Sequence, residues 1–207
     1  MICNINFTNL IHKLFNMNRF SSFMDVKNQI NESIETKKKL LELSQDIEDA
    51  GKIIIDALQN GNKILICGNG GSAADSQHFA AELAGRFEKE RKPLAGIALT
   101  TDSSNLTAIG NDYGFDTVFS RQISAIGRSG DVLVAISTSG NSKNILLAVE
   151  NALSIGMKVV GLSGRDGGVM KNLPIKNVIV LSQKTSRIQE CHILIIHIWC
   201  GMVDEKY

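Results

Sequence analysis

The sequence lacks a long apolar run and an excess of charge of either sign. The longest apolar run is Ile193–Cys200, which contains His197 and is far too short to cross a bilayer. The 207 residues include 22 basic and 21 acidic side chains, for a formal net charge of +1. With so little net charge, we expect no nucleic-acid partner and no attachment to an anionic membrane.

The sequence also lacks a C-x-x-C pair and a secretory signal. We expect its cysteines to be unpaired thiols of a reduced, cytoplasmic protein. Residues 1–23 have scattered polar side chains and no continuous apolar segment before a small-residue cleavage site. We interpret residues 1–24 as a poorly determined N-terminal extension, with Met17 and Met24 as alternative starts. The cysteines are Cys3, Cys67, Cys191 and Cys200.

The chain is long enough for one α/β domain with a sizeable core, and we expect a single domain over residues 25–207. Residues 25–60 have apolar side chains three or four positions apart and are followed by Gly61. This pattern predicts one long N-terminal helix. Such a helix cannot bury its apolar stripe alone, so we expect it to pack on the core or on a neighbouring subunit.

Beyond residue 61, short apolar runs alternate with helical patterns. This alternation predicts a parallel sheet covered by helices on both faces, with ligands bound beyond the carboxyl ends of the strands. The predicted strands are Lys63–Cys67, Ala95–Leu99, Val132–Ile136, Lys158–Leu162 and Asn177–Leu181. The predicted helices are Ser72–Lys89, Ser103–Ile109, Asp116–Ile126, Ser142–Ile155, Gly168–Asn172 and Ser186–Glu205.

Two loops of small residues each follow a predicted strand and open a predicted helix. They are Gly68–Ser72 and Ser137–Ser142. Backbone N–H groups at such a helix N-terminus are unpaired, and the helix dipole adds positive potential, so the place suits a phosphate. Two such loops in one small domain predict a phosphorylated small molecule held between them.

Each loop also has a simpler interpretation. Gly68–Ala73 matches the dinucleotide fingerprint G-x-G-x-x-A, but the acidic residue required about 20 positions later fits poorly, because Asp102 lies farther along. A G-K-[S/T] motif is absent, which disfavours a nucleoside triphosphatase. In the second loop, Ser139 or Asn141 could cap the following helix. A cap explains one polar side chain of the five and leaves the others unexplained, so we favour phosphate.

Residues able to move protons or bind a metal follow the first loop. His78 and Glu82 are four positions apart, so they share one face of the predicted helix. Gln189 and His197 are eight positions apart, about 12 Å along an ideal helix. They can reach one ion only if their side chains converge or if one of them comes from another subunit. Structural roles are expected for His192, as a core histidine, and Glu190, as an ion-pair or capping residue.

Four blocks in a fixed order are more specific than either loop alone. They are Gly68–Glu82, Ala108–Phe119 (AIGNDYGFDTVF), Ala135–Ser142 (AISTSGNS) and Arg187–His197 (RIQECHILIIH). Together they resemble bacterial phosphoheptose isomerases of the SIS-domain family. The resemblance implies a flavodoxin-like, five-stranded parallel sheet flanked by helices, with a long N-terminal helix. It also implies a homotetramer with its sites at subunit interfaces.

Enzymes of that family interconvert sedoheptulose 7-phosphate and D-glycero-D-manno-heptose 7-phosphate, at the start of ADP-heptose synthesis for lipopolysaccharide or capsule. The resemblance implies that Glu82 and His197 are the catalytic acid/base pair and that a sugar phosphate is the substrate. It implies one zinc ion per subunit, with His78, Glu82, Gln189 and His197 as ligands. The residues implied to bind substrate are Asn69, Gly70, Gly71, Ser72, Glu82, Asn111, Asp112, Ser137, Thr138, Ser139, Ser142 and Gln189.

These residue types suit aldose–ketose isomerisation through a cis-enediol. A partly desolvated carboxylate can take and return the carbon-bound proton, and an imidazole can pass the oxygen-bound proton at neutral pH. A zinc ion polarises a carbonyl and stabilises an enediolate. Two alternatives stay open: a non-catalytic SIS protein that binds the replication initiator, and an isomerase of another sugar phosphate, such as an amino-sugar or pentose phosphate.

Overall fold

The computed structural model describes residues 24–207, so the predicted extension, apart from Met24, lies outside the described residues, as does Cys3. The helical segment predicted for residues 25–60 is confirmed from Val26 to Gln59, but a 3₁₀ turn divides it. A 3₁₀ helix has three residues per turn instead of the 3.6 of an α-helix. The apolar stripe therefore points in a different direction after η1 than before it. The elements are α2 (Val26–Lys38), η1 (Lys39–Leu43) and α3 (Ser44–Gln59).

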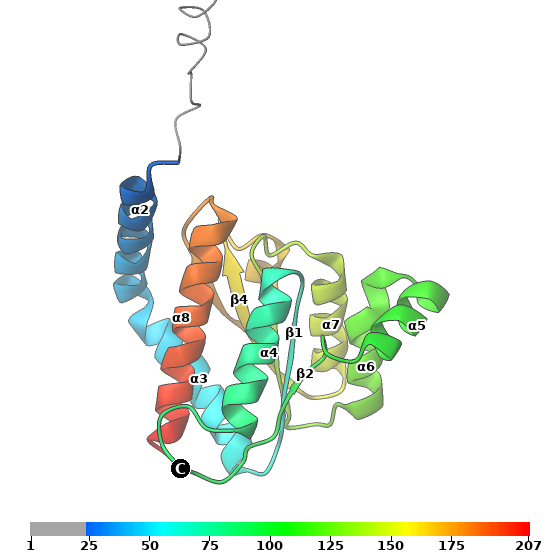
Figure 1. Cartoon of the computed structure of the whole chain (residues 1–207). Coiled ribbons are helices and arrows are strands. Elements are labelled where there is room, and N and C mark those ends of the chain that lie inside the picture. Colours follow the sequence, from blue (N-terminus) through cyan, green and yellow to red (C-terminus); the bar gives the residue numbers. More distant parts are fainter. Residues whose placement is uncertain (1–23) are drawn as a thin grey trace, which may run out of the picture.

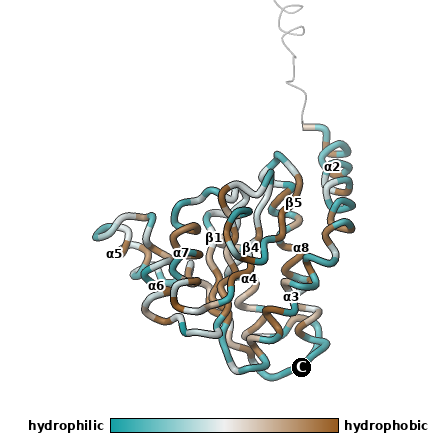
Figure 2. The backbone as a smooth tube through the Cα atoms, turned by 180° about the vertical axis from the view of Figure 1, so that it is seen from behind, coloured by the Kyte–Doolittle hydropathy of each residue, from teal (hydrophilic) through white to brown (hydrophobic). Residues whose placement is uncertain are grey.

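Five parallel strands form one sheet in the order β2-β1-β3-β4-β5, which confirms the predicted fold class. Every residue of β1 and β3 is buried, because helices cover both faces of the sheet. The apolar strands occupy the centre of the molecule in Figure 2. They are β1 (Ile64–Gly68), β2 (Gly96–Ala98), β3 (Val132–Ser137), β4 (Lys158–Gly164) and β5 (Lys176–Val180), each within two residues of its predicted bounds.

The helices form two layers around the sheet (Figure 1). Side chains alternate along β1, so Ile64 and Ile66 pack against α3, α4 and α8, whereas Leu65 packs with α6 and α7 on the other face. The indole N–H of Trp199 on α8 donates to the carbonyl oxygen of Ile47 on α3 at 2.9 Å. The remaining elements are α4 (Gly71–Ala84), α5 (Ser103–Tyr113), η2 (Phe115–Thr117), α6 (Val118–Ile126), α7 (Lys143–Ser154), η3 (Val169–Asn172) and α8 (Thr185–Asp204).

Four predicted helices differ from the structure in extent or in type. The helix predicted over Asp116–Ile126 is divided into the 3₁₀ turn η2 and the helix α6, which begins at Val118. The helix after β1 stops at Ala84 and not at the predicted Lys89, because the backbone of Gly85 leaves the helical region. Helix α5 continues past the predicted end at Ile109 to Tyr113. The short helix predicted after β4 is the 3₁₀ turn η3. None of these differences moves the two predicted phosphate loops.

The strand order reverses beside β1. The chain runs from β1 outward to β2 and then crosses back to β3, on the other side of β1. Gly68 at the end of β1 is the register partner of Ile136 near the end of β3. The loops after these strands therefore lie next to one another at the carboxyl edge of the sheet. Open α/β sheets bind ligands at this kind of reversal.

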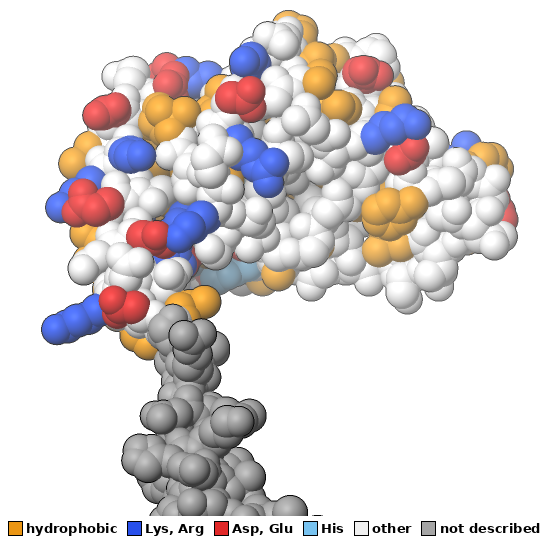
Figure 3. Space-filling view, turned by 90° about the horizontal axis from the view of Figure 1, so that it is seen from above, with side chains coloured by type: hydrophobic (Ala, Val, Ile, Leu, Met, Phe, Trp, Pro, Cys, Tyr) orange, Lys and Arg blue, Asp and Glu red, His pale blue; other side chains and the backbone are white. Residues whose placement is uncertain are grey.

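The surface combines mixed charges with an apolar stripe. Basic and acidic side chains are interspersed over the face seen in Figure 3. Within residues 24–207, no helix is long and apolar enough to cross a membrane. Val26, Ile30 and Ile34 of α2 are four positions apart and 69%, 54% and 45% exposed, so they form a stripe along one side of that helix. The three described cysteines are free, buried thiols, as predicted.

Candidate functional site

Two amide side chains join the predicted phosphate loops. Asn69 in the first loop donates to the side-chain oxygen of Asn144 at 2.9 Å, and Asn144 donates back to that of Asn69 at 2.8 Å. Asn144 lies in the first turn of α7 and is 4% exposed, so the pair is largely shielded from water and holds the loops at a fixed separation. Asn144 was not predicted from the sequence; its only signal there is its position just after the polar loop.

The second loop places four side-chain hydroxyl groups just before the start of α7. Ser137 is buried, and its Oγ lies 3.0 Å from the Oγ of Ser142, while Thr138 and Ser139 are half-buried. Ser142 is the N-cap residue of α7, yet its side chain makes no capping hydrogen bond. Asn141 accepts a hydrogen bond from the backbone of η3 instead. The polar side chains are thus not used as a helix cap, which favours the phosphate interpretation.

Gln189 of α8 lies against the first loop. Gly70 has a φ of +56°, a conformation that glycine adopts without steric cost, and Gly71 begins α4. A Cβ atom at Gly71 would overlap the side-chain amide of Gln189, so the two residues are in close contact. Ser72 is buried, and the N-terminus of α4 has no side-chain cap. Backbone N–H groups and the Gln189 amide therefore meet at the end of β1.

His78, Glu82 and His197 form a contiguous cluster between α4 and α8. The Nε2 atom of His78 lies 3.0 Å from Oε1 of Glu82 and 3.4 Å from Nε2 of His197. The side chains of His78 and Glu82 are 43% and 22% exposed, so a substrate can approach the carboxylate. The ring of Phe87 stacks on the imidazole of His197, with 5.5 Å between the ring centroids. The structure thus brings the predicted acid/base pair together, with His78 between them.

Three of the four predicted zinc ligands belong to this cluster. In the described part of the chain, no three His, Cys, Asp or Glu side chains are arranged as a ready-made metal site. The 3.4 Å between the two imidazole Nε2 atoms of His78 and His197 is nevertheless close to the roughly 3.3 Å that separates two ligands of a tetrahedral zinc ion. Gln189 lies two helical turns from His197 and contacts Gly71. The donor set therefore suits zinc chemically.

Asp75 is a candidate site residue that was not predicted. It lies on α4 one turn before His78, and among residues 24–207 its buried Oδ2 atom has no hydrogen-bond partner. Burial raises the pKa of Asp75 to about 6, and the nearby His78 partly opposes that shift. Carboxyl groups that titrate near neutral pH are frequent at functional sites. The signal available in the sequence was its spacing, three before His78 and seven before Glu82 on one helical face.

Asn111 and Asp112 lie apart from the other predicted substrate residues. Both are exposed on α5, where the Asn111 side-chain amide donates to the Asp112 carboxylate at 2.8 Å. Helix α5 buries none of its residues and lies at the opposite end of the molecule from α8 (Figure 1). Asp102 caps α5 by accepting from the N–H of Asn105 at 2.9 Å, which gives it a structural role in place of ribose binding. A single chain does not bring Asn111 and Asp112 to the two loops.

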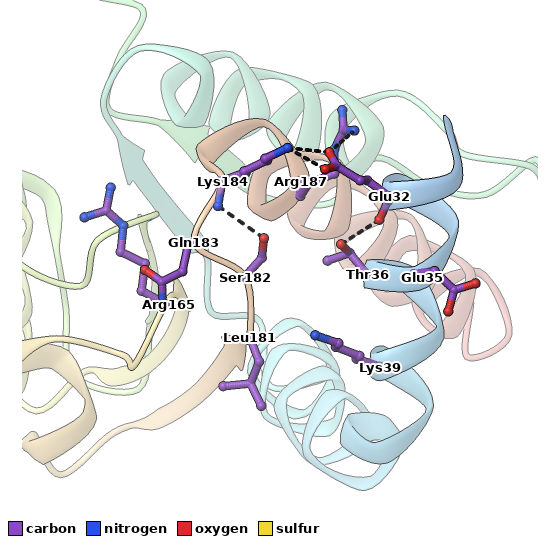
Figure 4. A pocket seen from close by; sticks show the side chains of 10 residues that line it. All are labelled: Glu32, Glu35, Thr36, Lys39, Arg165, Leu181, Ser182, Gln183, Lys184 and Arg187. Atoms are coloured by element: carbon purple, nitrogen blue, oxygen red, sulfur yellow. Dashed lines mark hydrogen bonds and ion pairs between the residues drawn. The ribbon is translucent and has the colours of Figure 1, made fainter. Parts of the chain in front are cut away.

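A cavity of about 520 Å³ lies between α2 and the start of α8 (Figure 4). Two of its four lining cations are paired: Lys184 contacts both carboxylate oxygens of Glu32 at 2.5 and 2.6 Å, and Arg187 pairs with Glu190. This pair confirms the ion-pair role expected for Glu190. Arg187 and Gln189 are two residues apart, about 200° around the helix. The cavity therefore lies on the α2 side of α8, away from the two loops.

Comparisons with known proteins agree with this arrangement. The SIS domain family model matches residues 27–164. A phosphoheptose isomerase of Campylobacter concisus is 57% identical over 182 residues, which are 88% of this chain and 96% of the relative. A solved phosphoheptose isomerase from Neisseria gonorrhoeae has a TM-score of 0.82 at 50% identity and covers 87% of this chain and 97% of its own. One from Francisella tularensis has a TM-score of 0.84 at 41% identity, covering 87% and 96%.

Proposed function

The chain belongs to the phosphoheptose isomerase family of SIS-domain proteins, and from this membership we propose that it interconverts sedoheptulose 7-phosphate and D-glycero-D-manno-heptose 7-phosphate. The observation that carries the proposal is the contiguous Glu82, His78 and His197 cluster on the helix that follows the first loop and on its neighbour. The loops suit a phosphate and the cluster suits proton transfer. The product feeds ADP-heptose synthesis for lipopolysaccharide or capsule.

Each side chain of the site has a separate role in the proposed cis-enediol mechanism. Glu82 removes the proton from C1 of the ketose and returns it to C2, because its carboxylate is the acid/base group of the cluster that a substrate can approach. His197 moves the second proton between the two oxygen atoms. His78 holds the Glu82 carboxylate by its 3.0 Å contact. The hydroxyl loop from Ser137 to Ser142 anchors the phosphate, so the reacting carbons are positioned from the far end of the sugar.

Zinc is the proposed cofactor, at one ion per subunit. His78, Glu82, Gln189 and His197 would hold it, and their imidazole, carboxylate and amide donors are types that zinc accepts. When bound, the ion polarises the substrate carbonyl and stabilises the enediolate. We expect elemental analysis to find up to one zinc per subunit and chelation to lower activity or the melting temperature. Full activity of metal-free protein would remove zinc from the proposal.

The proposed assembly is a homotetramer with sites beside the subunit contacts. The exposed apolar stripe of Val26, Ile30 and Ile34 supports it, as does an apolar groove of about 260 Å³ between η1 and α8. Asn111 and Asp112 lie away from the loops of their own chain, so their use in a site requires contact between subunits. Light scattering should give a mass near four chains. A monomer at working concentration would contradict the proposal.

We place the protein in the cytoplasm, a proposal supported by the buried free thiols. A non-catalytic SIS protein that binds the replication initiator has no need for Glu82, His78 and His197 to converge, so their contiguity favours an enzyme. The sugar, however, is best assigned by direct assay. Purified protein is incubated with sedoheptulose 7-phosphate, an amino-sugar phosphate and a pentose phosphate, and the aldose products are followed by NMR. We expect turnover of the heptulose; turnover of another sugar alone, or of none, would overturn the assignment.

A further inference from the structure

The segment between α4 and β2 is tied to the C-terminal end of α8 by one buried carboxylate. Asp204, the last residue of α8, is 3% exposed. Its Oδ2 atom accepts hydrogen bonds from the backbone N–H groups of Glu88 and Lys89, both at 2.8 Å. Its Oδ1 atom accepts from Nε of Arg91, also at 2.8 Å. In Figure 1 this segment passes beside the end of α8, close to the C-terminus.

Arg91 connects the same carboxylate to the end of α4. One terminal nitrogen of its guanidinium donates to the carbonyl oxygen of Leu83 at 2.9 Å, and the other donates to that of Glu82 at 2.6 Å. These carbonyls belong to the last turn of α4, where no helical N–H group is available to them. A cation at this end also complements the helix dipole. The backbone of Glu82 is therefore fixed to Asp204 through one buried side chain.

Phe87 links this segment to the site, because its ring contacts the imidazole of His197. It immediately precedes Glu88, whose N–H group Asp204 holds, and its ring stacks on His197 at 5.5 Å with 27° between the planes. The other ring against His197 is that of His78, which meets it edge-on at a centroid distance of 5.0 Å. The orientation of the His197 ring thus depends on where the segment places Phe87.

We propose that Arg91, Asp204 and Phe87 are positioning residues for the acid/base pair, a role that rests on the proposed isomerase function. The buried Arg91–Asp204 pair fixes the segment and the end of α4 together, and Phe87 fixes the His197 imidazole relative to the Glu82 carboxylate. Removal of two charges from water is costly, and an apolar pair could close the same gap. The ion pair additionally binds backbone groups at the end of α4 and in the segment that follows it, which an apolar pair cannot do.

Phe87→Leu tests the proposal without disturbing the buried ion pair, and Phe87→Tyr is the matched control because it keeps the aromatic face. With sedoheptulose 7-phosphate, Phe87→Leu should lower kcat about tenfold, because a misoriented catalytic group loses much of its effect. KM should change less than twofold. Phe87→Tyr should restore kcat to within twofold of the unmodified protein. A Phe87→Leu kcat within twofold, or a Tyr variant as slow as the Leu variant, would overturn the positioning role.

Asp204→Asn then tests whether the ion pair acts through Phe87. If it does, the double variant with Phe87→Leu loses little more than the slower single variant, because both changes remove one effect. Independent, multiplicative losses would show that the ion pair only supports the fold. If Asp204→Asn does not fold, Phe87→Leu still decides the proposal. Absence of turnover in the unmodified protein would instead reject the isomerase function and leave the packing of these residues unaffected.

Discussion

Gly71→Ala is expected to alter the candidate site while leaving the fold intact. An added methyl group at Gly71 would lie within 3.0 Å of the three terminal atoms of the Gln189 amide. The φ of Gly71 is not positive, so alanine fits the backbone of α4. The clash falls on the end of a flexible side chain, which can rotate away. We therefore expect the Gln189 amide to leave the first loop while the fold is kept.

The size of the effect follows from the hydrogen bond that the Gln189 amide is proposed to make with the bound substrate. A hydrogen bond from an amide to a substrate oxygen or to a charged group contributes about 1–2 kcal/mol. A loss of this size lowers kcat/KM for sedoheptulose 7-phosphate by about 5- to 30-fold. The melting temperature should change by only a few degrees, because alanine at a helical position offsets part of any strain.

Steady-state kinetics and thermal unfolding of the same preparations check this prediction. Gly201→Ala in α8, one turn after His197, is the control, because its added methyl group meets no described atom within 4 Å. It should leave kcat/KM unchanged. A folded Gly71→Ala variant with kcat/KM within twofold of the unmodified protein would show that Gln189 has no role at the first loop.

Two further variants test the phosphate loop and the buried histidine of the core. Ser137→Ala combined with Ser142→Ala should raise KM for sedoheptulose 7-phosphate more than it lowers kcat; unchanged inhibition by inorganic phosphate would exclude phosphate binding there. Burial lowers the pKa of His192 to about 4, while its Nε2 donates to the carbonyl oxygen of Ser163 at 3.0 Å. The unfolded chain takes up this proton below about pH 6.5, so the free energy of unfolding should fall by about 2 kcal/mol between pH 7.5 and 5 from this group. His192→Gln should remove that part of the slope in urea unfolding, and an unchanged slope would refute it.

The fold could be predicted because its signals are local. The five strands are short, largely apolar runs of three to seven residues, and each is followed by a turn and a helical pattern. The sequence also predicted where the two loops meet, because parallel strands end at the same edge of the sheet. The end of α4 was predicted wrongly at Lys89. Gly85 was a local signal for the earlier end. Arg91, seven residues after Ala84, additionally binds the carbonyls of Glu82 and Leu83, a contact that no local pattern indicates.

For the candidate site, the sequence was enough to predict the residue types and their spacing along a helix. It was not enough to predict the contacts between residues far apart in the chain. The four-residue spacing of His78 and Glu82 predicted a shared face, and the structure adds His197 to them. The Asn69–Asn144 pair depends on the register between β1 and β3, which is set by packing rather than by local sequence. Likewise, the raised pKa of Asp75 results from burial, which depends on the neighbouring elements.

Solvent deuterium exchange tests the central claim most directly, because it detects proton removal from carbon. Sedoheptulose 7-phosphate is incubated in D₂O, and deuterium at C1 of the ketose and C2 of the aldose is followed by NMR with the unmodified protein and with Glu82→Gln. Glutamine keeps the size of the side chain and lacks the basic carboxylate, so exchange and isomerisation should both fall by about 10²- to 10⁴-fold with the fold intact. Exchange by Glu82→Gln within tenfold of the unmodified protein would contradict the assignment of Glu82 as the base.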